Sequence, residues 1–178
     1  MSLLSLQTLI DNLLESSRIE AGMFALRRQP VAMEELILDA LAIARPLLDR
    51  RGQSVSITEP AALGPVAVDR GRMTQALVNL LSNASKYSPI GRPIDLWVEQ
   101  RAGAVRVAVA DRGPGIPPEQ RDNVYRRFVR LDEVGQEQQG MGLGLYLVKK
   151  IVEAHDGAVG VDDREGGGAV FWLELPAA

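Results

Sequence analysis

The residues best suited to chemistry lie in one stretch, 72–88, which reads RMTQALVNLLSNASKYS. On a helix that turns about 100° per residue, Asn79, Asn83 and Lys86 fall in one narrow polar stripe opposite a leucine-rich face. Carboxamide oxygens can ligate a hard cation, and a lysine can bind phosphate. The ordinary alternative for such a helix taken alone is a solvated polar stripe, so the downstream sequence has to decide between the two.

Two downstream stretches could complete a ligand site. Asp111 follows an apolar strand and precedes a Gly-Pro-Gly turn. Its carboxylate can accept a hydrogen bond from an exocyclic amine such as that of adenine, although an aspartate in isolation more commonly initiates a turn. The run from Gly140 to Gly144 precedes a predicted helix. Glycines let the backbone approach a phosphate, and a helix N-terminus offers free N–H groups to an anion. A turn that needs glycine only for packing is an alternative interpretation of equal weight to a phosphate site.

Apolar spacing predicts the elements that must position these residues. Three helices are expected, at 33–50, at 72–88 with Asp69 as its N-cap, and from the glycine run to residue 154. About five strands, mostly in hairpins, are expected among 55–57, 66–68, 94–98, 105–109, 159–161 and 170–173. This order predicts an α+β layer with the helices on one face.

Two further segments have a distinct pattern. Residues 4–22 repeat apolar residues at heptad-like spacing and end at Gly22, a plausible C-cap. Half of a helical hairpin or dimerisation bundle and a terminal helix docked on its own domain fit this pattern equally well. Residues 119–139 are polar, which is typical of a mobile functional loop or lid.

The composition excludes several classes of function. The chain has 178 residues, no cysteine and one histidine, which excludes disulfides and thiol catalysis and argues against zinc. A net charge of −3 without a basic block argues against nucleic acid as a partner. No apolar run approaches the length of about 18 residues that a membrane span needs.

Five motifs in a fixed order carry a family resemblance. NLLSNASKYS, DRGPGIP, YRRF, GMGLGLYLVKKIVEAHDG and GGGAVFWLELP follow one another along the chain. This series resembles the N, G1, F, G2 and G3 boxes of the ATP-binding catalytic domain of bacterial sensor histidine kinases, and it covers residues 30–176. The resemblance implies the fold of Hsp90-type ATPases, an α/β sandwich in which a mixed, mostly antiparallel sheet is covered on one face by helices.

The resemblance also divides the chain and implies its cofactors. Residues 1–22 resemble the end of the second helix of the dimerisation and phosphotransfer hairpin, 23–30 a linker, and 31–178 the ATP-binding domain. The cofactors would be ATP and Mg²⁺. Asn83 and Asn79 would be the metal ligands, and Asn79 and Lys86 the catalytic residues. The positions expected to bind the cofactor are Asn79, Asn83, Lys86, Tyr87, Asp111, Gly113, Gly115, Ile116, Phe128, Gly140, Met141, Gly142, Leu143 and Gly144. Among them, Phe128 would anchor a lid spanning 117–139.

The chain departs from the family pattern at two positions. Met141 and Ala169 stand where the family commonly has hydroxyl residues, so each removes a possible bond to phosphate or, through water, to adenine. His155, the only histidine, occupies a structural position at the end of the last helix, where the helix dipole would favour it. The phosphoacceptor histidine is therefore expected outside this chain, and autophosphorylation of the chain alone is not expected.

The resemblance implies transfer of the γ-phosphoryl group of Mg-ATP to a histidine outside the chain, in two-component signal transduction. The implied partners are a response regulator receiver domain and, in the full-length parent, a second copy bound through the helical hairpin. The implied location is the cytoplasm, with anchoring of the parent in the inner membrane left open. A nucleotide-binding regulatory module without kinase activity and a related-fold serine kinase are the alternative functions.

Overall fold

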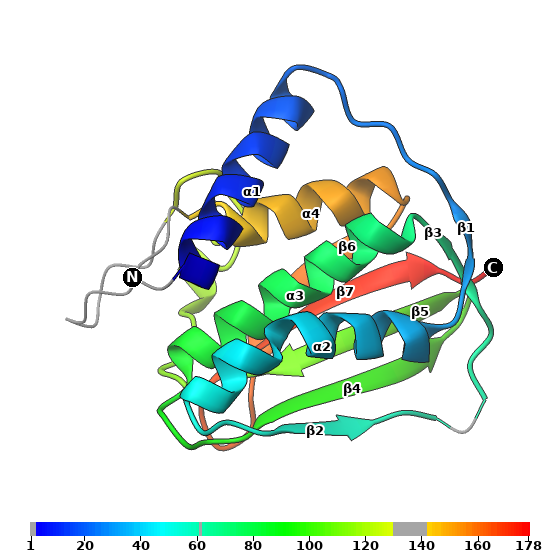
Figure 1. Cartoon of the computed structure of the whole chain (residues 1–178). Coiled ribbons are helices and arrows are strands. Elements are labelled where there is room, and N and C mark those ends of the chain that lie inside the picture. Colours follow the sequence, from blue (N-terminus) through cyan, green and yellow to red (C-terminus); the bar gives the residue numbers. More distant parts are fainter. Residues whose placement is uncertain (1–2, 61, 130–141) are drawn as a thin grey trace.

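The computed structural model describes residues 3–60, 62–129 and 142–178, and in these ranges three helices cover one face of a five-stranded sheet (Figure 1). The elements follow the order α1 (Leu3–Glu20), β1 (Gln29–Val31), α2 (Met33–Arg50), β2 (Val55–Thr58), β3 (Val66–Val68), α3 (Arg70–Tyr87), β4 (Ile94–Arg101), β5 (Ala104–Ala110), a 3-10 turn (Pro118–Gln120), α4 (Gly144–Ala154), β6 (Ala158–Asp163) and β7 (Ala169–Pro176). The predicted helices in the body of the chain are confirmed, with ends within two residues of the expected ones.

The sheet has the strand order β2-β4-β5-β7-β6. The β2–β4 pair is parallel, and the β4–β5, β5–β7 and β7–β6 pairs are antiparallel. The predicted mixed, mostly antiparallel sheet with helices on one face is therefore confirmed. Because β5 lies in the centre of the sheet, the residue that follows it, Asp111, leaves the sheet between β4 and β7.

The core lies between this sheet and helices α2, α3 and α4. Alternate residues of β4 and β5 point inward, as the period of two in their sequences predicts. Leucine and isoleucine side chains from the three helices pack against them. The fully buried residues include Leu36, Ile37, Leu77, Leu80, Leu81, Ile94, Leu96, Val107, Val109, Leu147 and Ile151. This packing fixes α3 over the sheet between α2 and α4 (Figure 1).

The start of α3 is set by the predicted N-cap. The side chain of Asp69 accepts a hydrogen bond from the backbone N–H of Arg72 at 3.1 Å. Such a cap satisfies one of the free N–H groups in the first turn of a helix. The polar stripe of α3 is thereby held in one rotational setting relative to the sheet.

A second, two-stranded sheet ties the segment before α2 to the domain. In it β1 pairs antiparallel with β3, with Pro30 opposite Ala67. The sequence predicts β3 as a short strand but does not identify its partner. Three-residue strands carry too little periodicity to specify a pairing at long range.

Helix α1 lies against α4 and α3 (Figure 1). Gly22 ends it in a left-handed turn, where the N–H groups of Gly22 and Met23 donate to the carbonyls of Ile19 and Arg18, which is a Schellman motif. Three buried polar residues face the domain, Asn12, Glu15 and Ser16, whereas Leu6, Ile10, Leu13 and Leu14 are exposed on α1. Of the two alternatives for this segment, the structure has the docked helix; its origin in a phosphotransfer hairpin remains a prediction.

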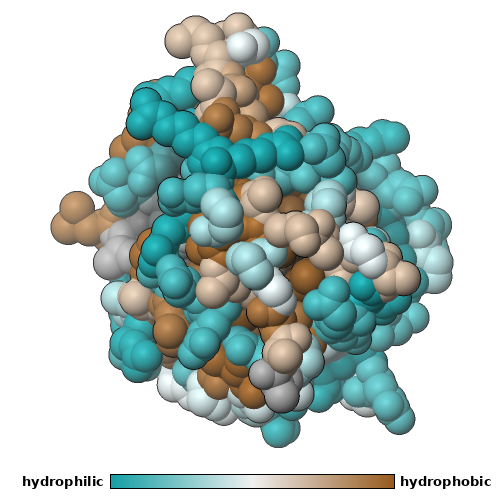
Figure 2. All heavy atoms as spheres, turned by 90° about the vertical axis from the view of Figure 1, so that its right-hand side faces the viewer, coloured by the Kyte–Doolittle hydropathy of each residue, from teal (hydrophilic) through white to brown (hydrophobic). Residues whose placement is uncertain are grey.

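Other surfaces are mixed in character. Figure 2 looks onto the end of the molecule where β1, β3 and the C-terminus lie, and it shows hydrophilic side chains with apolar ones interspersed. Within the described residues, no helix is long and apolar enough to cross a membrane.

Candidate functional site

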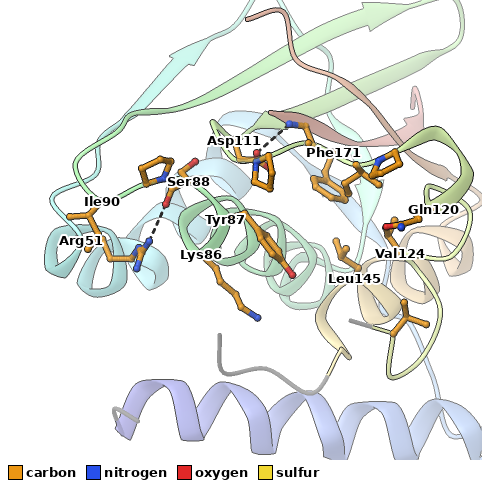
Figure 3. A pocket seen from close by; sticks show the side chains of 17 residues that line it. Arg51, Lys86, Tyr87, Ser88, Ile90, Asp111, Gln120, Val124, Leu145 and Phe171 are labelled. Atoms are coloured by element: carbon orange, nitrogen blue, oxygen red, sulfur yellow. Dashed lines mark hydrogen bonds between the residues drawn. The ribbon is translucent and has the colours of Figure 1, made fainter. Parts of the chain in front are cut away.

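A cavity of about 750 Å³ opens between the C-terminal end of α3, the segment after β5 and the start of α4 (Figure 3). This volume is in the usual range for small-molecule sites. The lining residues come from segments far apart in the sequence, and they are Arg51, Lys86, Tyr87, Ser88, Pro89, Ile90, Asp111, Pro114, Gly115, Ile116, Pro117, Gln120, Val124, Val129, Leu145, Ala169 and Phe171. Five of the predicted site residues are among them: Lys86, Tyr87, Asp111, Gly115 and Ile116.

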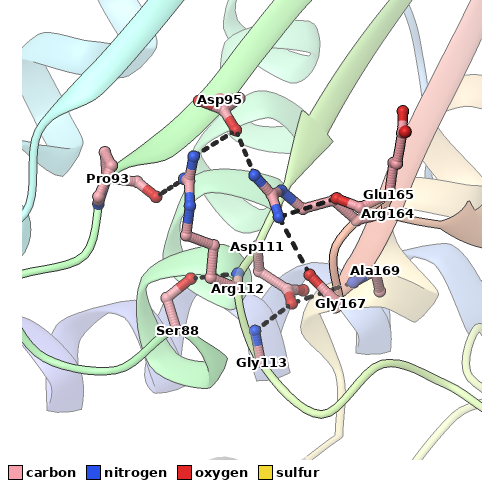
Figure 4. A network of polar contacts seen from close by, with 10 residues as sticks. All are labelled: Ser88, Pro93, Asp95, Asp111, Arg112, Gly113, Arg164, Glu165, Gly167 and Ala169. Atoms are coloured by element: carbon pink, nitrogen blue, oxygen red, sulfur yellow. Dashed lines mark hydrogen bonds and ion pairs between the residues drawn. The ribbon is translucent and has the colours of Figure 1, made fainter.

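Asp111 is the buried acid of the cavity, with 2% of its surface exposed. Its Oδ1 accepts hydrogen bonds from the backbone N–H groups of Gly113 at 2.9 Å and of Ala169 at 3.2 Å (Figure 4). Its own N–H donates to the carbonyl of Ala169 at 2.9 Å and so extends the β5–β7 pairing. Because Oδ1 serves both backbone donors, Oδ2 is the oxygen that can accept from a ligand.

Burial raises the pKa of Asp111 above its ordinary value, while the two backbone donors and the nearby Arg164 guanidinium act in the opposite direction. The backbone donors favour the charged carboxylate because they bond to it directly. A buried carboxylate whose second oxygen has no backbone donor can accept a hydrogen bond from a ligand in the cavity.

Apolar side chains form the walls beside Asp111. Ile116, Val124, Leu145 and Phe171 line the cavity, and Figure 3 shows the last three grouped on one side of it. Such walls suit a flat apolar ring that carries a polar edge, because the ring buries its faces and its edge bonds to the acid.

The other side of the cavity is polar. Lys86 and Tyr87 project from the last turn of α3, with the Lys86 ammonium 5.5 Å from the centre of the Tyr87 ring. Lys86 lines the cavity, and its side chain points toward α1 (Figure 3). A cation at this place can bind a phosphate that extends out of the cavity.

Arg51 and Ser88 are cavity residues that the sequence does not predict. The Arg51 guanidinium donates to the carbonyls of Ser85 and Ser88, both at 3.0 Å, and so joins the end of α2 to the end of α3. The Ser88 hydroxyl accepts from the backbone N–H of Arg112 at 2.9 Å. These bonds depend on tertiary contacts between distant segments, and no motif in the sequence signals them.

The two asparagines of the predicted site do not line the cavity. Asn79 is 6% exposed, lies in a separate groove of about 420 Å³ and accepts from Nδ2 of Asn12 at 3.2 Å. Asn83 lies one turn closer to Lys86 on α3. The side-chain nitrogens of Asn79 and Asn83 are both buried with no hydrogen-bond partner in the described part of the chain. Buried donors of this kind normally have a partner, so these two amides suit a bound group that supplies oxygen atoms.

The N-terminus of α4 lies beside Asn79 of α3. No side chain among the described residues caps this helix start, so its first N–H groups can bind an anion. Gly144 begins the helix so close to α3 that a Cβ on it would lie 3.4 Å from Oδ1 of Asn79. Leu143 is buried. Gly142 has a φ of +68°, and a Cβ there would lie 2.6 Å from the carbonyl oxygen of Val129, so only glycine fits.

Phe128 does not line the cavity. It has a φ of 62°, unusual for a bulky residue, and is 52% exposed, with its N–H donating to the Gly142 carbonyl at 3.0 Å. The predicted residues Gly140 and Met141, and the predicted lid beyond residue 129, lie outside the described residues. Gly113 contributes its N–H to Asp111 but is not a lining residue.

His155 is structural, as predicted, but it is not held there as a cation. Its Nδ1 donates to the Ile151 carbonyl at 2.7 Å, and its Nε2 accepts from the backbone N–H of Asp69 at 3.0 Å. Burial lowers the pKa of His155. An acceptor Nε2 requires the neutral ring, so hydrogen bonding outweighs the attraction of the helix dipole for a charged ring.

The comparisons with known proteins agree with this geometry. Residues 68–178 match a family model described as histidine kinase-, DNA gyrase B-, and HSP90-like ATPase. The chain is 36% identical over 173 residues to the sensor histidine kinase TmoS of Ectopseudomonas mendocina, an alignment that covers 94% of this chain and 17% of that protein.

Two solved structures have the same fold. The crystal structure of full-length ShkA in complex with AMPPNP superposes with a TM-score of 0.83 and 33% identity, over 97% of this chain and 36% of that one. The crystal structure of the histidine kinase ThkA in complex with the response regulator protein TrrA superposes with a TM-score of 0.77 and 26% identity, over 97% of this chain and 47% of that one.

The chain spans less than half the length of the curated relatives that it matches. Its match to the family model and its likeness to these kinases cover the cavity, the glycine turn before α4 and the acid at the end of β5. The chain therefore belongs to the histidine kinase-, DNA gyrase B- and HSP90-like ATPase family, as an ATP-binding catalytic domain of the sensor histidine kinase type.

Proposed function

We propose that this domain binds Mg-ATP with the adenine in the cavity and the phosphates at the N-terminus of α4. Within a longer sensor kinase it transfers the γ-phosphoryl group to a histidine other than His155. The observation that carries the proposal is the state of Asp111, whose Oδ1 is occupied by two backbone donors while Oδ2 remains for a ligand. The exocyclic amine of adenine is a donor that this oxygen can accept from.

The phosphates need donors and positive charge at the other end of the site. The uncapped start of α4 supplies backbone N–H groups, and Lys86 supplies an ammonium group. The orphaned amide nitrogens of Asn79 and Asn83 are further donors on the same side. These groups act mainly by positioning the phosphates and neutralising their charge.

Asn83 is the better of the two candidates for binding Mg²⁺. The described residues contain no group of three or more histidine, cysteine, aspartate or glutamate side chains that could hold a metal. The ion would then rely on amide and phosphate oxygens, which are ligands that Mg²⁺ accepts. The Asn79 oxygen already accepts from Asn12, whereas no hydrogen bond within the described ranges engages the Asn83 side-chain oxygen. When bound, Mg²⁺ would supply charge neutralisation between the phosphates.

The acceptor and the partners follow from the same proposal. His155 is buried and uses both ring nitrogens in hydrogen bonds, so it is unsuited to receive a phosphoryl group. A histidine on a helical hairpin would receive the phosphoryl group. Two copies of the kinase would form a dimer through that hairpin, and a response regulator receiver domain would then accept the phosphoryl group from the histidine. The complex of ThkA with TrrA supports the last step. We place the reaction in the cytoplasm, where ATP is available.

A regulatory nucleotide-binding module is the second candidate function. The contact between Asn12 and Asn79 favours it, because α1 covers a residue that the kinase reaction would use. In that function, nucleotide binding would control a partner contact without phosphoryl transfer.

Calorimetric titration with the ATP analogue AMPPNP, with and without Mg²⁺, tests the site. We expect Asn83→Ala to remove most of the gain in affinity that Mg²⁺ confers and to weaken metal-free binding less, because only the bond from its amide nitrogen is then lost. Asp111→Asn should weaken binding under both conditions. Ser82→Ala, on the same turn of α3 but outside the cavity, is the matched control. Equal affinities for all four proteins would refute the site.

A second experiment separates the two functions. The chain is incubated with γ-labelled ATP, alone and with a separate hairpin fragment of a sensor kinase that carries the acceptor histidine. The kinase function predicts acid-labile label on the fragment and none on His155. Label on His155 would refute the assignment of the acceptor, and tight nucleotide binding without any transfer would favour the regulatory module.

A further inference from the structure

Asp111 is held by two backbone N–H groups that come from different segments. Gly113 lies in the turn that follows β5, and Ala169 begins β7 after the loop 164–168. The position of the Asp111 carboxylate therefore depends on how firmly these two segments are held relative to each other. Figure 4 shows that an arginine in each segment reaches the same acid, Asp95 of β4.

The first arm of this network is Arg112. Its Nη2 lies 3.0 Å from Oδ2 of Asp95, and its Nη1 donates to the carbonyl of Pro93. Its backbone N–H donates to the Ser88 hydroxyl at 2.9 Å. Arg112 is the residue between Asp111 and Gly113, so its bonds on both sides fix the turn that presents the Gly113 N–H to Asp111.

The second arm is Arg164. Its Nη2 lies 3.5 Å from the same Oδ2 of Asp95. Its Nη1 donates to the carbonyls of Glu165 and Gly167, both at 3.2 Å, and its backbone N–H donates to the Gly168 carbonyl at 3.1 Å. One side chain thus holds the loop in a closed turn and ties it to β4.

The loop meets Asp111 at Gly168. Gly168 has a φ of +111°, and a Cβ on it would lie 2.1 Å from the backbone oxygen of Asp111. Only glycine allows this approach, and the next residue, Ala169, donates its N–H to Oδ1 of Asp111. The loop held by Arg164 therefore sets the second bond to the acid.

We propose that Asp95, Arg112 and Arg164 form a clamp that positions Asp111 to read adenine. Asp95 holds both segments that donate to Oδ1, through one arginine in each. Loss of the clamp therefore lets the Asp111 carboxylate tilt away from the orientation in which its second oxygen meets the base. The three side chains are partly buried, at 31%, 25% and 21% exposure, where ion pairs are less screened than on the open surface. They are positioning residues, because none of them lines the cavity. The inference rests on the proposed function, in which adenine is the base bound at Asp111.

The test compares ADP with inosine diphosphate, IDP, which has an oxygen in place of the exocyclic amine. Dissociation constants for both are measured by calorimetry with the wild type, Asp95→Ala and Arg164→Ala. We expect each variant to weaken ADP binding three- to tenfold and to change IDP binding less than twofold, because only ADP needs the oriented acid.

The control is Glu174→Ala. It removes an ion pair with Arg106 of comparable exposure, on the same face of the sheet but at the far end of β5 and β7 from Asp111. This variant should leave both constants unchanged. Asp111→Asn gives the change in the two dissociation constants when the acid itself is lost.

Four results would overturn the clamp. Variants that change neither constant, or that weaken ADP and IDP equally, show that these residues do not act through the reading of the base. If the wild type binds ADP and IDP equally, or Asp111→Asn binds ADP like the wild type, the proposed function fails and the clamp fails with it.

Where an alanine variant does not fold, Arg164→Lys keeps the charge but cannot bond to Asp95 and both loop carbonyls together. Amide hydrogen exchange of Gly113 and Ala169 in the nucleotide-free protein gives a readout independent of ligand. The clamp predicts faster exchange at both amides in Arg164→Lys; unchanged protection at both would contradict it.

Discussion

The side-chain amide of Asn12 on α1 donates a hydrogen bond to Oδ1 of Asn79 on α3 at 3.2 Å. The contact joins a residue of the N-terminal helix to one that the family resemblance places beside the phosphates. Around it, the ion pair of Arg72 with Glu15 and the 3.0 Å hydrogen bond of Arg127 to the Ser16 hydroxyl hold α1 in place.

Removal of this contact should strengthen Mg-nucleotide binding. Asn12→Ala frees the Asn79 oxygen, and a hydrogen bond between neutral groups contributes about 1 kcal/mol, so we expect roughly fivefold tighter binding of Mg-AMPPNP. Metal-free ADP binding should not change. Gln7→Ala, which removes a bond within α1 to Asp11, is the control. Weaker or unchanged Mg-AMPPNP affinity in Asn12→Ala would show that the Asn79 oxygen takes no part in binding.

The stability of the fold should decrease in mild acid because of His155. Burial lowers the pKa of His155 below its ordinary value of 6.5, so the unfolded chain takes up a proton before the folded one does. The stabilisation is present above pH 6.5 and is lost as the pH falls through the folded pKa. Urea unfolding between pH 5 and 8 should show this loss for the wild type.

His155→Gln tests the origin of this loss. The variant lowers stability at pH 8, because it gives up the packing of the ring and two hydrogen bonds. It has no ionisable group at this position, so the decrease between pH 6.5 and 5 should be smaller than in the wild type. Parallel pH profiles would place the ionising group elsewhere.

The buried charge of Asp111 should lower the stability of the nucleotide-free domain. The pKa of Asp111 is raised, so stability from its protonated form is full below the ordinary value of 3.8 and is lost as the pH rises through the folded pKa. At pH 7, Asp111→Asn keeps an acceptor for the two backbone donors and removes the buried charge. We expect a higher unfolding midpoint without nucleotide; a gain of about 1 kcal/mol would appear as roughly 2–4 °C for a chain of this size.

The pH dependence checks this explanation. The advantage of Asp111→Asn should shrink as the pH falls below the folded pKa of Asp111, because the wild-type carboxyl is then neutral as well. A variant less stable than the wild type at pH 7 would mean that the backbone donors more than offset the cost of burial.

The parts of the fold with strong local signals could be predicted from the sequence. The helix boundaries follow from apolar periodicity and from Asp69, whose carboxylate caps α3 as expected. The β4–β5 hairpin follows from alternation, and Asp111 follows from its place at the end of a strand. Each of these depends on residues within a few positions of one another.

The remainder depends on contacts between distant segments. The partner of β3, the parallel pairing of β2 with β4 and the hydrogen bond that the Arg112 N–H donates to the Ser88 hydroxyl have no local signal. The position of α1 also depends on contacts between distant segments. Its apolar spacing allows either a hairpin or a docked helix, and the buried polar contacts by which Asn12 and Glu15 dock it on the domain have no local signal.

The base preference of Asp111→Asn tests the central claim most directly. In the wild type, Oδ2 of Asp111 accepts from the exocyclic amine of adenine, so ADP should bind more tightly than IDP. In the variant, the side-chain oxygen of the introduced asparagine would stay with Gly113 and Ala169, and its NH₂ would face the base. The account predicts a reversal, with IDP preferred over ADP, in calorimetric titrations of both proteins. The same preference for ADP in both proteins would contradict it.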